Sequence, residues 1–166
     1  GFQHMDLAVI AAALSYHNRG MFGESRALLS QIGPQSEYAA LAQYLTAVAF
    51  VEQGMLAEAR TELEAVLDRP RSTSSEAALA DRAVIALAQI YVEEGDLGQA
   101  HEMYDRVSPY SPYYDVGMLG KVWVFMRQQE YQEAYNLAQR VLTEVPASDL
   151  RSEFELAMAN CALGAD

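Results

Sequence analysis

The chain has little of the chemistry on which disulfides, metal sites and nucleic-acid interfaces depend. Its 166 residues include one cysteine, Cys161, and three histidines that lie far apart. One cysteine excludes an internal disulfide, and scattered histidines give no zinc-ligand spacing, so we expect no metal and no cofactor. One lysine accompanies ten arginines, the formal net charge is −12, and Arg69 and Arg71 are the only basic cluster. This charge argues against nucleic acid as a partner.

Long apolar runs are also missing. The longest, residues 7–14, is shorter than the roughly 20 residues of a membrane span and has no basic leader before it, so we expect neither direct membrane insertion nor a signal peptide here. Residues 1–4, before Met5, are interpreted as a cloning remnant. The compartment stays open between a bacterial periplasm or envelope and the cytoplasm.

The sequence does contain a recurring frame: a glycine, or glutamine in one case, is followed two residues later by a large apolar residue and three residues after that by a small one. The frames run from Gly20 through Phe22 to Ser25, from Gly54 through Leu56 to Ala59, from Gly95 through Leu97 to Ala100, and from Gln129 through Tyr131 to Ala134. Phe22 and Leu56 are 34 residues apart, Leu56 and Leu97 are 41 apart, and Leu97 and Tyr131 are again 34 apart. Glycine suits the left-handed backbone that ends a helix. A period near 34 residues predicts repeated helix-turn-helix units.

The third of these units has the most complete pattern. Small Ala88 follows Leu87, Tyr91 comes three residues later, and then come the Gly95 frame, Tyr104 and Val107. This order of small and large residues resembles the tetratricopeptide repeat. The resemblance covers nearly the whole chain and implies an all-α, right-handed α-solenoid of about four repeats with a C-terminal capping helix. The alternative for that last helix is the first half of a truncated repeat.

The expected organisation is a single repeat domain over residues 5–166. Its units lie at about 6–34, 36–70, 75–109 and 113–146, with a terminal helix at 149–163. The expected helices are 6–18, 22–32, 36–53, 56–68, 75–94, 97–107, 113–128, 131–143 and 149–163, and no segment alternates with the period of a strand. Leu119-Gly120 stands two residues early for the family's Leu-Gly pair, so the seventh helix is expected to be longer or rotated.

The resemblance also implies a binding surface, because the first helix of each repeat lines a concave groove in this family. The groove residues that this implies are Tyr44, Val48, Val51, Arg82, Ile85, Gln89, Trp123 and Met126. Apolar positions among them favour a protein or peptide segment with apolar side chains as the partner. The competing interpretation is that neighbouring helices of the chain itself fill the groove.

A second candidate surface lies where two Ser-Pro steps interrupt a run of tyrosines. Tyr110 and Tyr114 form this secondary patch, since tyrosine offers a rigid ring with one polar end. Tyr104 and Tyr113 are expected to pack instead.

No nucleophile elbow, phosphate-binding loop or His-Glu-x-x-His motif occurs, so we predict no catalytic residues and no enzyme activity. By the resemblance, the function is a protein-protein interaction scaffold or adaptor, placed by analogy in a bacterial envelope, secretion, pilus or motility assembly. The alternative is a repeat arm of a longer enzyme or regulator. Homo-oligomerisation remains open.

Overall fold

The computed structural model describes residues 2–164, and every regular element in that range is an α-helix. The helices are α1 (Phe2–Asn18), α2 (Phe22–Leu29), α3 (Ala39–Glu52), α4 (Leu56–Leu67), α5 (Ser74–Glu94), α6 (Leu97–Asp105), α7 (Tyr114–Arg127), α8 (Tyr131–Glu144) and α9 (Arg151–Gly164). The predicted all-α class is confirmed, and none of these helices is long and apolar enough to cross a membrane.

Among the helix starts, those of α1 and α3 differ most from the expected residues. The first helix begins at Phe2, ahead of the expected residue 6, so residues interpreted as a cloning remnant continue the helical backbone. The third helix begins at Ala39 and not near residue 36, because the Ser36 hydroxyl accepts a hydrogen bond from the Tyr38 N–H at 3.1 Å and holds a turn there.

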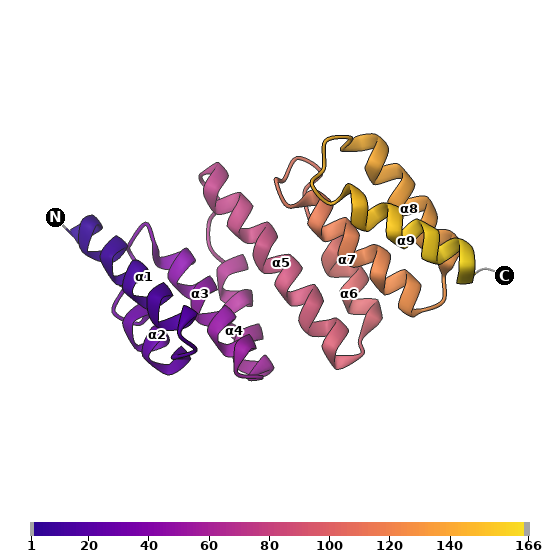
Figure 1. Cartoon of the computed structure of the whole chain (residues 1–166). Helices are drawn as coiled ribbons and strands as arrows, with labels where there is room; N and C mark the ends of the chain where they lie inside the picture. The colour runs from indigo at the N-terminus through magenta and orange to yellow at the C-terminus, as the bar shows by residue number, and fades with distance from the viewer. Residues whose placement is uncertain (1, 165–166) are drawn as a thin grey trace. The chain divides into compact units, whose positions relative to one another are not determined.

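The described chain forms two compact units, and the division between them falls inside α5. The N-terminal unit extends to Ala83 and contains α1 to α4 with the first half of α5. The C-terminal unit begins at Val84 and contains the rest of α5 with α6 to α9 (Figure 1). Contacts join α1 to α2 and α3 to α4 in the N-terminal unit, and α7 to α8 in the C-terminal unit, and the helices of each such pair run antiparallel, as in a helix-turn-helix repeat (Figure 1).

The turn inside each pair has the left-handed backbone that the glycines predict. The φ angles are +74° at Gly20, +72° at Gly54, +82° at Gly95 and +63° at Gln129. Gln129 is the one non-glycine residue with positive φ in the described chain, and it stands where the repeat frame places glycine. The fourth turn therefore keeps the backbone conformation without the residue that suits it best.

The small residues of each frame are buried where the paired helices cross. Ala59, Ala100 and Ala134 are fully buried, as are Ala13 and Ala47 on the first helices of their pairs. A small side chain at such a crossing lets the two helix axes approach closely. The repeat register predicted from the sequence is consistent with this burial.

Gly120, which lies early for the family pattern, has a packing role. A Cβ built on it would lie 2.5 Å from the ring of Tyr104, and one on Gly117 would lie 3.1 Å from Val107. Thus α7 approaches α6 through two glycines one turn apart. The Tyr104 ring is buried in this contact, and burial raises the pKa of its hydroxyl to about 12.

The loops between repeats share a Pro-x-Ser sequence that sequence reasoning had missed. It occurs at Pro34–Ser36, Pro70–Ser72, Pro109–Ser111 and Pro146–Ser148. Three of these serine hydroxyls accept a hydrogen bond from the backbone N–H two residues later, each at 3.1 Å. Ser36 also donates to Asp6, and Ser148 donates to Asp115. The hydroxyl thus connects each of these two loops to the first turns of the preceding first helix.

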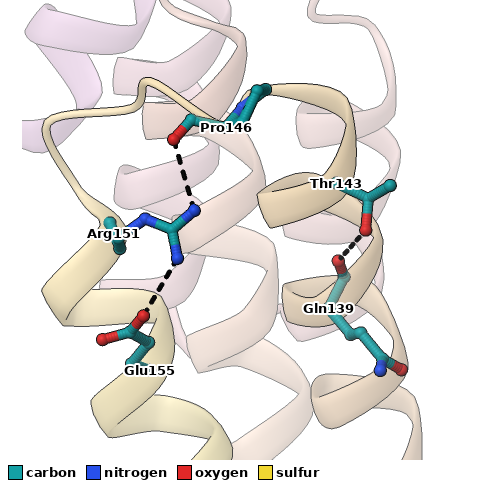
Figure 2. Close-up of polar contacts among 5 residues, drawn as sticks. All are labelled: Gln139, Thr143, Pro146, Arg151 and Glu155. Atoms are coloured by element: carbon teal, nitrogen blue, oxygen red, sulfur yellow. Dashed lines mark hydrogen bonds and ion pairs between the residues drawn. The ribbon is translucent and has the colours of Figure 1, made fainter.

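Arg151 fixes the loop between α8 and α9 (Figure 2). Its guanidinium donates to the Pro146 carbonyl at 3.3 Å and to Glu155 at 3.1 Å. In the same view, the Thr143 hydroxyl donates to the Gln139 carbonyl within α8, at 3.0 Å. These contacts fix the start of α9 relative to the end of α8.

Candidate protein-binding surfaces

A small hollow lies among the helices of the N-terminal unit. Its volume is about 200 Å³, and it is lined by Ala13, Leu14, His17, Ser25, Leu29, Tyr44, Leu45, Val48 and Arg82. Three of the predicted groove residues, Tyr44, Val48 and Arg82, thus come together around one cavity. Val51, one turn further along α3, is exposed and is not part of the lining.

Tyr44 and Arg82 form one side of this hollow. The Arg82 guanidinium carbon lies 4.6 Å from the centre of the Tyr44 ring, which is the geometry of a cation–π contact. Tyr44 is only 8% exposed, so its ring is a wall of the hollow and does not project from the surface. The charge of Arg82 thereby borders an apolar cavity.

Ser25 is the unexpected member of the lining. It occupies the small crossing position of the first repeat and is 2% exposed. Its side chain borders the open volume of the hollow. The sequence frame marks this position as small, but it gives no sign that a cavity would adjoin it.

Leu14 and His17 form the α1 side of the hollow. Leu14 is 39% exposed and lies at the open margin of the hollow. The His17 ring packs edge-on against Phe22 with 5.0 Å between ring centres. The hollow is therefore apolar in most of its wall, with a hydroxyl, an imidazole and a guanidinium at its margin.

In the C-terminal unit, the predicted groove residues are more spread out. Trp123 is 41% exposed and Val116, two turns earlier on α7, is 40% exposed, so the two side chains share one helix face. Met126 is half-buried and packs against the core of α7, α8 and α9. Ile85 is buried, and Gln89 is exposed.

The two tyrosines of the predicted secondary patch differ in their surroundings. Tyr110 is 97% exposed in the loop before α7. Tyr114 packs partly against the α7–α8–α9 core, and its hydroxyl donates to the Glu144 carboxylate at 2.9 Å. Burial, together with the neighbouring Glu144, raises the pKa of the Tyr114 hydroxyl. Only Tyr110 presents a whole ring to solvent.

Groups suited to metal chemistry do not cluster within the described range. No set of three or more histidine, cysteine, aspartate or glutamate side chains could hold a metal ion there. His101 is engaged with Gln128 at 2.7 Å and stacks on Phe125, with 4.4 Å between ring centres. Burial raises the pKa of the Cys161 thiol, which disfavours the reactive thiolate.

Comparisons with known proteins agree with this geometry. A family model described as a tetratricopeptide repeat-like domain matches residues 7–142, and the chain belongs to this family. Repeats of this class typically form protein-interaction modules, with extended surfaces that bind other proteins. A search of curated proteins gave no significant match.

Two solved structures have a similar fold. Both are of a Podosopora anserina protein described as a kinesin light chain with nearly identical TPR-like repeats. The first, a point variant of that protein, is 18% identical with a TM-score of 0.76, and the match covers 99% of this chain and 88% of that one. The other structure is 16% identical with a TM-score of 0.68, and the match covers 95% of this chain and 85% of that one. At this identity the likeness concerns the fold alone.

Proposed function

We propose that the protein is a non-catalytic scaffold or adaptor that binds a protein segment on the exposed faces of the first helices of its repeats. The observation that carries the proposal is the hollow of the N-terminal unit, which brings Tyr44, Val48 and Arg82 together. Such a surface suits an extended or helical segment that inserts an apolar side chain.

The size of the hollow fits one side chain. An apolar cavity of about 150 Å³ is large enough for benzene, so a volume of about 200 Å³ accommodates a leucine- or phenylalanine-sized group. The aliphatic walls provide the burial, and the Ser25 hydroxyl in the lining can hydrogen-bond a backbone group that accompanies the side chain. Arg82 and Tyr44 hold the rim in a defined geometry.

In the C-terminal unit, Trp123 and Val116 offer a second apolar contact on α7. Exposed tryptophan is enriched among the residues that dominate binding energy at protein interfaces. Each unit thus has an apolar contact of its own for a protein segment. The bacterial envelope, secretion, pilus or motility setting remains a prediction by analogy with similar repeat arrays.

The proposal is tested by selecting peptides from a random display library on the purified protein. We expect the selected peptides to share an apolar anchor and to lose binding when Val48→Phe fills the hollow. Val51→Phe is the matched control, because Val51 is exposed on the same helix and does not line the cavity. Equal binding to the wild type and to Val48→Phe, with unchanged melting of both variants, would contradict the proposal.

A further inference from the structure

A second groove is lined by residues of α8 and α9 in the C-terminal unit. It consists of two adjoining hollows of about 320 and 640 Å³, which share Tyr131 and Gln132 in their lining. The remaining lining residues are Gln129, Glu130, Glu133, Tyr135, Cys161, Ala162 and Gly164. We call this surface the α8–α9 groove.

The groove combines an apolar centre with an acidic end. Tyr131 and Tyr135 are half-buried against the core, and Cys161 and Ala162 form the opposite wall. Glu130 and Glu133 lie at the start of α8, and none of the lining residues is basic. The groove therefore offers tyrosine rings for contact and a negative edge for orientation.

The internal repeats indicate what shape fits there. The loops before α7 and α9 share the Pro-x-Ser sequence, which aligns Ser111 with Ser148 and so aligns Val122 with Ala159 and Phe125 with Ala162. On α7, Val122 and Phe125 pack into the core that α8 completes. On α9, the corresponding Ala159 and Ala162 are exposed. A helix covers this face of α7, and none within the described residues covers it on α9.

The negative charge of the groove favours one kind of partner helix. The chain carries a net charge of −12, so a second copy would bring further negative charge to Glu130 and Glu133. A helix with lysine or arginine beside its apolar stripe would instead meet a negative edge, which favours association and fixes orientation. Small Ala159 and Ala162 allow a close approach of its backbone.

We propose that the α8–α9 groove binds a basic amphipathic helix of a partner protein. The apolar stripe of that helix packs on Tyr131, Tyr135 and Ala162, and its basic margin lies beside Glu130 and Glu133. This surface uses none of the residues assigned to the proposed segment-binding sites on α1, α3, α5 and α7. It would let the scaffold hold a second partner by a different binding mode.

The groove is already formed without an occupant. Arg151 ties the start of α9 to the Pro146 carbonyl (Figure 2). The Leu150 N–H donates a hydrogen bond to the Ser148 hydroxyl. At the other end, Gly164 approaches Tyr131 so closely that a Cβ would lie 2.8 Å from the ring. Because these contacts hold both ends of the α8–α9 groove, less of the protein has to become ordered when a partner binds.

The probe is a synthetic helical peptide of 14 residues, the length of α9, with a leucine stripe and lysine margins. Two matched peptides accompany it: one carries glutamate in place of lysine, and one is a scrambled version without a stripe. Fluorescence anisotropy measures the binding of each to the intact protein. We expect the lysine peptide to bind and to weaken with added salt, and the other two to bind much more weakly.

Two pairs of variants locate the site. Ala162→Arg places bulk and positive charge in the groove and should weaken binding of the lysine peptide at least about tenfold. Asn160→Arg, exposed on another face of α9, should leave it unchanged. Glu133→Lys should weaken binding several-fold, whereas Glu153→Lys, also in the first turn of its helix, should not.

Unchanged peptide affinity in Ala162→Arg, or equal binding of the scrambled or glutamate peptide, would overturn the proposal. A protein that sediments as a dimer and becomes monomeric in Ala162→Arg would instead assign the groove to a second copy and would also overturn it. Melting curves of each variant separate a lost site from a lost fold.

Discussion

The first helix pair, α1–α2, and the fourth, α7–α8, follow the same frame with different residues. The first has Gly20 in its turn and Ser25 at the crossing, whereas the fourth has Gln129 and Ala134. Both turns are left-handed and both crossings are buried. The difference shows that the repeat preserves a backbone conformation and a close crossing, and that glycine is only the least strained way to reach that conformation.

The two pairs differ more in what lies beside them. At equivalent positions of the frame, 109 residues apart, α1 has Ala8 and Ala11 where α7 has Gly117 and Gly120. The alanines are exposed, while the glycines admit the side chains of Tyr104 in α6 and of Val107 just after it. The crossing of the first pair also adjoins an open hollow at Ser25. Helix pairs that follow the same frame thus present different surfaces, because different side chains pack beside them.

The largest effect should come from enlarging the crossings. Ala134→Leu should destabilise the protein by about 1 to 3 kcal/mol, because a fully buried crossing has no space for the added atoms. Ser25→Leu should destabilise the protein by a clearly smaller amount, because the leucine side chain can enter the adjoining hollow. Equilibrium unfolding in urea measures both. Equal losses would show that the hollow does not accommodate a side chain.

A smaller effect is expected from Gly120→Ala. The added Cβ would meet the buried Tyr104 ring at 2.5 Å, so α6 and α7 must move apart, and we expect a net loss of about 1 to 2 kcal/mol after the gain in helix propensity. Ala11→Ser in α1 is the control and should change stability by less than about 0.5 kcal/mol. A Gly120→Ala variant as stable as the wild type would contradict the close packing.

Exchanging the turn residues tests the backbone part of the comparison. Gln129→Gly should stabilise the protein by about 0.5 to 1 kcal/mol, because it relieves the strain of a positive φ. Gly20→Gln should destabilise it by about 1 kcal/mol for the same reason. No other atom lies within 4 Å of a Cβ at Gly20, so the loss isolates backbone strain from crowding. Thermal melts with matched urea titrations would detect either change, and shifts of the same sign would refute the argument.

The smallest effect concerns the Ser25 hydroxyl. Ser25→Ala should change the unfolding free energy by no more than about 0.5 kcal/mol, because alanine keeps a small side chain at the crossing and the hydroxyl borders an open hollow. A loss above about 1 kcal/mol would show that the hydroxyl has a partner in solution, such as a bound water.

The sequence predicted the repeat register because its signals are local. A glycine that must adopt positive φ, a small residue at each crossing and an apolar stripe along each helix all act within one helix pair. The positions of Ala59, Ala100 and Ala134 follow from these constraints. The position of Gly120 does not follow from the frame of its own helix pair. Glycine stands there because the Tyr104 ring of the preceding helix leaves no space for a Cβ.

The candidate site was predicted less completely. The family resemblance named Tyr44, Val48 and Arg82, and these three residues do surround one hollow. It could not indicate Ser25, because a small crossing residue has the same sequence signature whether or not a cavity lies beside it. Nor could it separate Tyr110 from Tyr114, because the exposure of each depends on contacts with α8.

The sequence by itself determined the helical class, the repeat frame, the left-handed turns and the absence of disulfide chemistry, because each depends on the residues of a short segment or on composition. The tertiary structure alone decided where α6 presses on α7, where the N-terminal unit leaves a hollow and where α8 and α9 leave a groove. These features depend on how side chains from segments far apart in the chain fill, or fail to fill, the space between helices.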